Sequence, residues 1–210
     1  MTPPPVERTV RFVLGSASPA RLTTLRAAGV EPEVVVSNVD ESALTAPTVG
    51  ELVQVLAGAK ADAVAAAVPT ALILACDSLL ELDGAALGKP GTAEQATIRW
   101  RAMRGRTGVL HTGHTLRTPD GRRLSALAST GVRFADVTDA EIAAYVATGE
   151  PLNVAGAFTI DGLGGWFVEA VDGDHHNVVG LSLPLLRRML HELGYALGDL
   201  GLSGYPANQG

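Results

Sequence analysis

The sequence predicts an α/β domain with a mixed central sheet flanked by helices, and three observations support this prediction. Apolar strand-like runs alternate with helix-start signals in the first half of the chain. Three Asp-Gly pairs, which favour hairpin turns, lie beside later apolar runs. With 210 residues, 47% of them hydrophobic, the chain can bury one substantial core. We therefore expect one sheet that combines parallel and antiparallel strands.

Strands are expected where short apolar or alternating runs are bounded by turn residues. These runs are residues 10–14, 33–37, 71–82, 109–116, 124–134, 166–171 and 178–181. The Asp-Gly pairs at residues 83–84, 120–121 and 172–173 are expected to form hairpin turns.

Helix starts are marked by capping residues. Ser18 reads as an N-cap with Pro19 at the first helical position. Capping-box patterns mark three further helices, at Thr48 with Glu51, Thr92 with Gln95, and Thr138 with Glu141. A last helix is expected at residues 183–193, before a glycine.

Composition excludes several classes of function. The net charge of −6 argues against a broad nucleic-acid surface, and the 4% of aromatic residues argues against a platform that stacks single strands. The longest apolar stretch, residues 63–76, is broken by Pro69 and is shorter than the ~20 residues of a membrane helix. The single cysteine, Cys76, has no disulfide partner, as is typical of a reducing compartment. We expect a cytoplasmic protein without a nucleic-acid or membrane partner.

The chain is expected to form one domain with short extensions. Residues 1–9 contain three prolines and no apolar region of a secretory signal, so a flexible N-terminus is expected. Residues 10–196 hold the strand and helix patterns and form the single domain. Residues 197–210 are rich in glycine and proline, which favours a loosely ordered tail.

The stretch Leu14-Gly15-Ser16-Ala17-Ser18-Pro19-Ala20-Arg21 joins a strand to a helix start through small residues. Such a turn presents backbone N–H groups and the positive end of a helix dipole to an anion, and Arg21 in the first turn can reach the same place. The sequence is neither a Walker A loop nor a G-x-G-x-x-G loop. A phosphate site and a simply well-capped helix are both consistent with it.

Carboxylates and lysines occur near other strand ends. Asp77 follows a buried run without a turn signal, which favours a general base or metal ligand. Asp40 and Glu41 follow an earlier strand, and the carboxyl ends of strands are where α/β sheets bind ligands. Lys89 lies in a Gly-Lys-Pro-Gly turn, and Lys60 interrupts an alanine-rich helix, where it either snorkels to water or points into a cleft.

A glycine-rich segment, residues 149–165, contains Asp161 and either lines a ligand site or is a flexible connection. The histidines do not predict a metal centre. His111 and His114 are three residues apart on a strand and so point to opposite faces. His175 and His176 adjoin an Asp-Gly turn, which favours a surface loop over a zinc site.

Taken in order, these motifs make the chain resemble the Maf family of nucleoside triphosphate pyrophosphatases, some of which are described as septum formation inhibitors. The resemblance spans residues 12–194. It rests on residues 14–21, Ser-Asn-Val-Asp-Glu at 37–41, Ala-Cys-Asp-Ser at 75–78, Leu-Gly-Lys-Pro at 87–90, Arg-Gly-Arg-Thr at 104–107, Gly-Glu-Pro-Leu at 149–152, Asp-Gly-Leu-Gly at 161–164 and Asn-Val-Val-Gly-Leu at 177–181.

The resemblance implies a two-lobed α/β fold like that of inosine triphosphatases, with a cleft between the lobes, often as a homodimer. It implies hydrolysis of a nucleoside triphosphate at the α–β linkage to a monophosphate and pyrophosphate, with Mg²⁺ or Mn²⁺ as cofactor. Asp77 matches the catalytic aspartate and, with Glu41, the metal ligands. The positions that match phosphate ligands are Ser16, Arg21, Lys60 and Lys89.

Three departures from the family pattern concern specificity. Members that act on dTTP and UTP carry Arg, Thr and Gln where this chain has Ala20, Ser78 and Asp161, and members that act on 7-methyl-GTP usually carry Trp, Gln and Glu. The chain fits neither set. The alternative function is a non-catalytic nucleotide-binding regulator of cell division. A phosphatase with an aspartate nucleophile is disfavoured because its second aspartate is replaced by Leu79.

Overall fold

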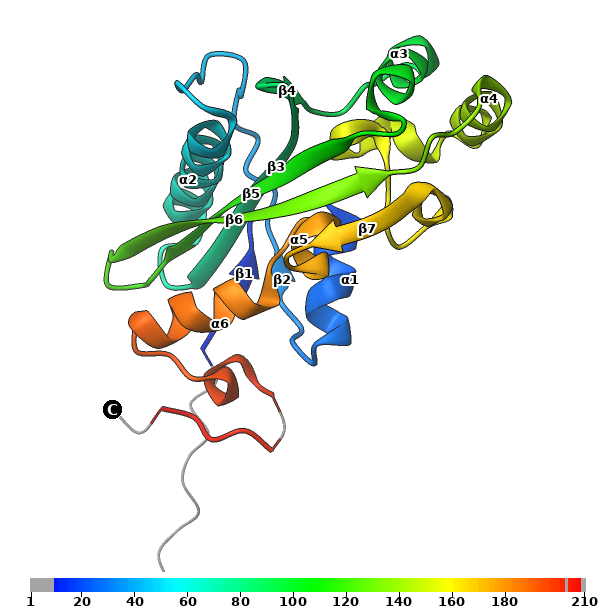
Figure 1. The fold of residues 1–210 in the computed structure, drawn as a ribbon. Helices are drawn as coiled ribbons and strands as arrows, with labels where there is room; N and C mark the ends of the chain where they lie inside the picture. Colours follow the sequence, from blue (N-terminus) through cyan, green and yellow to red (C-terminus); the bar gives the residue numbers. More distant parts are fainter. Residues whose placement is uncertain (1–9, 203, 209–210) are drawn as a thin grey trace, which may run out of the picture.

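The computed structural model describes residues 10–202 and 204–208, and within this part the chain forms one seven-stranded sheet with helices on both faces (Figure 1). The strands lie in the order β2-β1-β3-β5-β6-β7, with β4 paired to β3. Their bounds are β1 Phe12–Leu14, β2 Glu33–Val34, β3 Leu72–Leu82, β4 Ala85–Leu87, β5 Thr107–Arg117, β6 Arg123–Phe134 and β7 Val168–Asp172. Strand β1 runs parallel to β2 and β3, and the other pairs are antiparallel. The predicted mixed α/β sheet is therefore confirmed.

The helices begin at the residues that the capping signals indicate. Their bounds are α1 Pro19–Ala27, α2 Val49–Ala67, α3 Ala93–Met103, α4 Asp139–Ala147, α5 His175–Val179 and α6 Leu183–Glu192, with short 3-10 helices η1 Glu150–Asn153, η2 Ala155–Ala157, η3 Leu163–Phe167 and η4 Leu197–Leu200. Full capping boxes form at Thr48 and Thr138, whereas Thr92 only accepts a bond from Gln95 N. Among the described helices, none combines the length and apolar character needed to cross a bilayer.

Helix α2 lies directly against the sheet because β5 has a glycine where the two meet. A Cβ built on Gly113 would collide with the backbone of Val53 in α2. Gly113 is paired with Asp77 across β5 and β3, so both residues face α2. Helices α5 and α6 pack on the strands from the other face, as Figure 1 shows. The register of this pair thus places Asp77 beneath α2.

Two separate hydrophobic clusters form the two lobes of the molecule. The first contains β1, the start of β3 and α6, with Leu14, Leu74 and Leu190 fully or almost fully buried. The second contains the end of β3 with α3 and α4, and its centre is Trp100, whose indole N–H donates to Ala157 O at 2.8 Å. Because β3 and β5 run through both clusters, the long strands hold the lobes together, as the two-lobed prediction requires.

Some predicted strands are wrong or shorter than expected. Residues 178–181, expected as a strand, instead belong to the end of α5 and the turn after it, because Asp174 caps that helix by accepting from His176 N. A short apolar run fits a buried helix as well as a strand. Residues 166–167 belong to η3, so β7 starts only at Val168, and β2 has two residues. The Asp-Gly pair at 172–173 leads from β7 into α5 and forms no hairpin.

The C-terminal segment is held more firmly than its composition suggests. A loosely ordered tail is expected from residue 197, whereas residues 197–200 form η4 and Leu200 packs into the first cluster. The Asp199 carboxylate accepts from Ala196 N at 2.7 Å and from Asn208 N at 3.1 Å. Val10 N also donates to Asp199 O at 2.8 Å. These bonds compensate for the scarcity of apolar residues. The expected flexible segment 1–9 lies outside the described residues.

His111 and His114 point to opposite faces of β5, as their spacing predicts. His111 contacts Ser129 and Glu81, whereas His114 is buried and connects the strand to the start of α6. Its Nδ1–H donates to Thr112 O at 3.0 Å, and its Nε2 accepts from Ser182 N at 2.9 Å. This pattern requires the neutral ring, and burial lowers the pKa of His114 to about 4.

The burial of neutral His114 predicts a loss of stability in acid. The unfolded imidazole gains a proton below about pH 6.5, while the folded one stays neutral down to about pH 4, so unfolding is favoured as pH falls between these values. Between pH 7 and pH 5, we expect this residue to lower the free energy of unfolding by about 2 kcal/mol. Urea unfolding of wild type and of His114→Gln at pH 7 and pH 5 measures this change in the free energy of unfolding.

The Gln side chain does not titrate, so the stability difference between wild type and His114→Gln should shrink by that amount at pH 5. His191, which is exposed on α6, provides the control substitution His191→Gln. Parallel stability curves for wild type and His114→Gln would contradict the assignment.

Candidate active site

The outer edge of β3 is open at its centre. Strand β1 pairs with residues 72–74 of β3, and β4 pairs with residues 80–82, so within the described part of the chain no strand pairs with the stretch between them. Asp77 lies in this stretch and is held from the other side by the continuous pairing of β3 with β5. The gap gives a ligand access to the middle of the sheet without loss of rigidity at Asp77.

A cleft of about 720 Å³ opens at this gap. Its walls come from both lobes and comprise residues 15–21, 36–39, Glu41, Lys60, residues 77–79, Gly88, Lys89, Leu110, residues 153–155, 158–161 and 178–180. The residues that the family resemblance assigns to the site all lie on these walls, namely Ser16, Ala20, Arg21, Glu41, Lys60, Asp77, Ser78, Lys89 and Asp161. Asp40, the other carboxylate at this strand end, does not line the cleft and accepts from Ser42 N at 3.0 Å. The structure thus brings together positions that are spread over 145 residues of sequence (161 minus 16).

A second hollow, of about 350 Å³, lies beside the exposed ring of Trp166. Two of its lining residues, Asp136 and Glu141, are acidic. A negatively charged lining repels a phosphate-bearing ligand. The larger cleft, which holds two lysines and an arginine, is therefore the candidate active site.

Lys60 joins Glu41 and Asp77, two of the three acidic residues that line the cleft. Its ammonium group contacts Asp77 Oδ1 and lies 2.8 Å from Glu41 Oε1. The side chains of Lys60 and Asp77 are only 13% and 11% exposed, and that of Glu41 is 49% exposed. Lys60 therefore points into the cleft and does not snorkel to water. Two carboxylates that share one cation form a site with affinity for positive charge.

Most N–H groups of the Arg21 guanidinium donate to other parts of the protein, which its position in the first turn of a helix does not predict. It is 8% exposed, and its Nε donates to Gly180 O at 2.8 Å. Nη1 donates to Ser16 Oγ at 3.1 Å and Cys76 O at 2.8 Å, and Nη2 donates to Ser78 Oγ at 2.9 Å. A guanidinium has five N–H donors, so one on Nη2 is left for a ligand. The bond to Cys76 O also covers an edge carbonyl of β3.

Ser16 is oriented by its own loop to donate. Its Oγ accepts from Ser18 N at 3.2 Å and from Arg21 Nη1 at 3.1 Å. With both acceptor positions of the hydroxyl occupied, its O–H is directed to a group in the cleft. The predicted phosphate loop therefore offers a hydroxyl donor beside the start of α1, where Ser18 is the confirmed N-cap.

Two residues that sequence reasoning missed support Ser78 and Arg21. Thr112, opposite Ser78 on β5, shares a hydrogen bond of 2.9 Å with the Ser78 hydroxyl. Gly180 has a φ of 116° and carries the carbonyl that holds Arg21 Nε. A Cβ at this position would lie 3.4 Å from that Nε. The Gly in Asn-Val-Val-Gly-Leu is a local signal for the turn, but its contact with Arg21 is long-range.

The remaining predicted residues line the outer part of the cleft. Lys89 is exposed in the turn before α3, and Asp161 is exposed in the loop between η2 and η3. Ala20 is half-buried in the first turn of α1. These three side chains can meet parts of a ligand that extend beyond Asp77.

Cys76 is buried beside the site but is no nucleophile. Burial raises the pKa of its thiol to about 12, so the thiol stays protonated near neutral pH. Its side chain belongs to the first hydrophobic cluster, as expected from the sequence.

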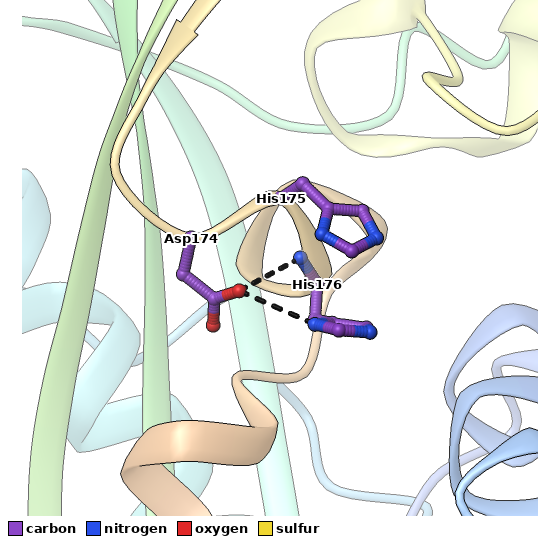
Figure 2. A group of neighbouring side chains, drawn as sticks. All are labelled: Asp174, His175 and His176. Atoms are coloured by element: carbon purple, nitrogen blue, oxygen red, sulfur yellow. Dashed lines mark hydrogen bonds and ion pairs between the residues drawn. The ribbon is translucent and has the colours of Figure 1, made fainter.

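Asp174, His175 and His176 form a second group of metal-ligand types at the start of α5, where the sequence predicts a surface loop. One ligand atom from each lies within 4.8 Å of the others. Asp174 Oδ1 already accepts from His176 N at 3.0 Å and pairs with His176 Nδ1 at 3.4 Å. Figure 2 shows the other carboxylate oxygen turned away from both rings. Asp174 Oδ1 is thus already engaged in capping α5.

A family model described as "Maf-like protein" matches residues 11–193. The chain is 61% identical over 203 residues to a nucleoside triphosphate pyrophosphatase of Streptomyces coelicolor, covering 95% of this chain and 97% of that protein. It is 60% identical to one of Streptomyces avermitilis, covering 90% and 94%. Among solved structures it is similar to the Ham1 protein of Staphylococcus aureus, with a TM-score of 0.44 and 17% identity over 60% of this chain and 72% of that one.

The family match covers the part of the chain that builds the cleft. It extends from β1 to α6, and the two relatives cover 95% and 90% of the chain. By these matches, the chain belongs to the family of Maf-like proteins.

Proposed function

We propose that the chain is a nucleoside triphosphate pyrophosphatase that hydrolyses the α–β phosphoanhydride. The observation that carries the proposal is the position of Asp77, fixed at the open edge of β3 in a cleft that also holds Lys60, Arg21 and Lys89. Relatives that share 60% or more of its sequence bear the name nucleoside triphosphate pyrophosphatase. The reaction takes one water and gives a nucleoside monophosphate and pyrophosphate.

The cleft supplies positive charge and donors for a polyanion. A triphosphate repels an attacking water's lone pair unless cations reduce its charge. Lys60 provides charge from α2 and Lys89 from the turn before α3, and Arg21 keeps one N–H for a ligand. Ser16 adds a hydroxyl donor at the start of α1. These groups bind the phosphates and hold the α-phosphorus near Asp77.

Asp77 is the catalytic base of this proposal. Its Oδ1 is paired with Lys60, which leaves Oδ2 for the attacking water. The water oxygen forms a bond to the α-phosphorus as the bond to the bridging oxygen breaks, and the water's proton passes to Oδ2. Pyrophosphate leaves with the bridging oxygen. The β-sheet pairing of Asp77 limits its movement, which favours a fixed geometry for this transfer.

A divalent cation, Mg²⁺ or Mn²⁺, is part of the proposal, and the residues present fit it. Glu41 and Asp77 already share one cation, the Lys60 ammonium, and carboxylate oxygens are the ligands that these ions prefer. When bound there, such an ion neutralises phosphate charge and lowers the pKa of water. Glu41 and Asp77 would hold it.

The base of the nucleotide is proposed to meet Ala20 and Asp161. Ala20 offers only a methyl group, which leaves room on that wall, and the Asp161 carboxylate accepts hydrogen bonds from a base N–H. Ser78 acts indirectly, since its hydroxyl is bound to Arg21 and Thr112. A homodimer, a cytoplasmic location and the lack of a nucleic-acid partner also remain part of this proposal.

The proposal predicts which bond breaks. Purified protein with Mn²⁺ and a panel of nucleoside triphosphates should release monophosphate and pyrophosphate for at least one of them. In ¹⁸O-labelled water, the label should enter the monophosphate, because water attacks the α-phosphorus. Diphosphate and phosphate as products would refute the bond assignment. Nucleotide binding without any turnover would favour the alternative, a non-catalytic regulator.

Asp77→Asn is predicted to lose activity while it stays folded. Asn has nearly the same shape but cannot take the proton, so we expect kcat to fall about 10²–10⁴-fold. Pyrophosphate release measures the loss, and circular dichroism checks the fold. Asp83, exposed in the hairpin between β3 and β4, provides the matched control Asp83→Asn. Full activity in Asp77→Asn would refute the role of this residue.

Lys60→Met is predicted to bind Mn²⁺ more tightly than wild type in the absence of nucleotide. The ammonium competes with a cation for Glu41 and Asp77, so its removal should raise affinity by at least about tenfold. Electron paramagnetic resonance of free Mn²⁺ measures this without any turnover. Lys89→Met is the control, because Lys89 lies in the turn before α3 and should affect nucleotide affinity only. Unchanged or weaker binding in Lys60→Met would exclude the competition.

A further inference from the structure

The segment from Glu150 to Gly164 forms one wall of the cleft without regular ladders. It contains η1, η2 and an irregular stretch, and residues 153–155 and 158–161 line the cleft. Phe158 anchors its middle by packing edge-to-face on Phe134, with ring centroids 5.0 Å apart. Beyond Phe158, the chain carries Asp161 into the cleft and returns to η3. The position of Asp161 therefore depends on tertiary contacts.

Glu150 supplies those contacts. Its Oε1 accepts from Tyr145 Oη at 3.0 Å and from the Thr159 hydroxyl. Two backbone groups on the other side of Asp161 also donate to the carboxylate, Leu163 N at 3.1 Å and Gly164 N at 3.0 Å. One carboxylate thus joins the start of the segment to residues that flank Asp161 on both sides.

Two glycines after Asp161 lie close to this carboxylate and to the hydroxyl that donates to it. A Cβ at Gly162 would lie 2.9 Å from both Glu150 oxygens, and one at Gly164 would lie 2.5 Å from Tyr145 Oη. The chain wraps so closely around Glu150 that side chains do not fit. The glycine-rich sequence here therefore reflects close approach of backbone to a half-buried polar contact.

The carboxylate of Glu150 is ionised at neutral pH. Burial alone would raise the pKa of Glu150, but the hydrogen bonds from Thr159, Gly164, Leu163 and Tyr145 outweigh burial and lower it. Hydrogen bonds to a charged acceptor are stronger than those between neutral groups. Four of them converge here, enough to define the conformation of a short loop.

We propose that Glu150 is a positioning residue that sets nucleotide specificity by holding Asp161 in the cleft. It lies outside the set of residues that line the cleft, so it acts through the loop and not on the substrate. The inference rests on the proposed function, because it assigns Asp161 to the base of the nucleotide. Glu150 belongs to the Gly-Glu-Pro-Leu motif at residues 149–152. The mechanism proposed around Asp77 gives that motif no role.

Two variants weaken this contact to different degrees. Glu150→Gln keeps the size of the side chain but replaces one acceptor oxygen by an amide group that cannot accept from a backbone N–H. Tyr145→Phe removes only one of the four donors and leaves the ring packed against Trp100 and Phe167. Glu94, exposed in the first turn of α3, provides the control Glu94→Gln.

Hydrogen exchange tests the contact without nucleotide. The amides of residues 159–165 should exchange faster in Glu150→Gln than in wild type, with a smaller increase in Tyr145→Phe and none in Glu94→Gln. Unchanged exchange in both test variants would overturn the proposal. This readout does not depend on activity, so it separates failure of the inference from failure of the proposed function. If Glu150→Gln does not fold, Tyr145→Phe still gives the answer.

Kinetics test the effect on specificity. For the preferred triphosphate, a loop that is correctly placed for only a tenth of the time raises KM about tenfold, while kcat changes less than about threefold. The ratios of kcat/KM among triphosphates should change as they do in Asp161→Asn. In the double variant of Glu150→Gln and Asp161→Asn, the changes in KM and in these ratios should be little larger than in either single variant. Both substitutions affect the same proposed contact, the one between Asp161 and the base of the nucleotide. Additive effects, or a fall in kcat at unchanged KM and unchanged ratios, would overturn the proposal.

Discussion

The open central edge of β3 is the constraint on which the rest of the site depends. A sheet edge that is free to pair attracts other strands, and proteins usually cover it. Here β1 covers the edge up to Leu74 and β4 covers it again from Leu80, so the exposed length is short. Arg21 caps the carbonyl of Cys76 within it. What remains accessible is the side of the strand that carries Asp77.

The gap lets both faces of the sheet contribute to one cleft. Asp77 faces α2, and Gly113 allows that helix to lie close enough for Lys60 to reach it. Ser78 faces the other way, toward Thr112 and Arg21. Two neighbouring residues of β3 therefore contact side chains on opposite faces of the sheet. The face toward α2 holds the acidic pair and its cation, and the opposite face holds the guanidinium, so charge of both signs stays near the reacting bond.

Local signals predicted the elements of this site better than its contacts. Ser18 and Pro19 mark a helix start whose geometry is set within one turn, so the start of α1 was predictable. Residues 178–181 were predicted as a strand because a short apolar run suits either structure, and the deciding cap at Asp174 is a single bond. Asp77 stood out because the apolar run continues after it at residues 79–82, so no turn explains a carboxylate there. The hydrogen bonds from Arg21 to the carbonyls of Gly180 and Cys76 join residues that are separated by 159 and 55 positions in the sequence. No local sequence pattern contains such contacts.

Chemistry and recognition are carried by parts of the fold with different rigidity. Asp77 is fixed by the long ladders that cross both hydrophobic clusters, so changes in the ligand's base scarcely disturb it. Asp161 lies in a loop whose shape is set by one carboxylate and by glycines that accommodate it. On the proposed function, sequence change in the loop would alter which nucleotide fits at little cost to Asp77. Under the same proposal, the reaction can be kept while the substrate varies, because Asp77 and Asp161 are held by separate sets of contacts.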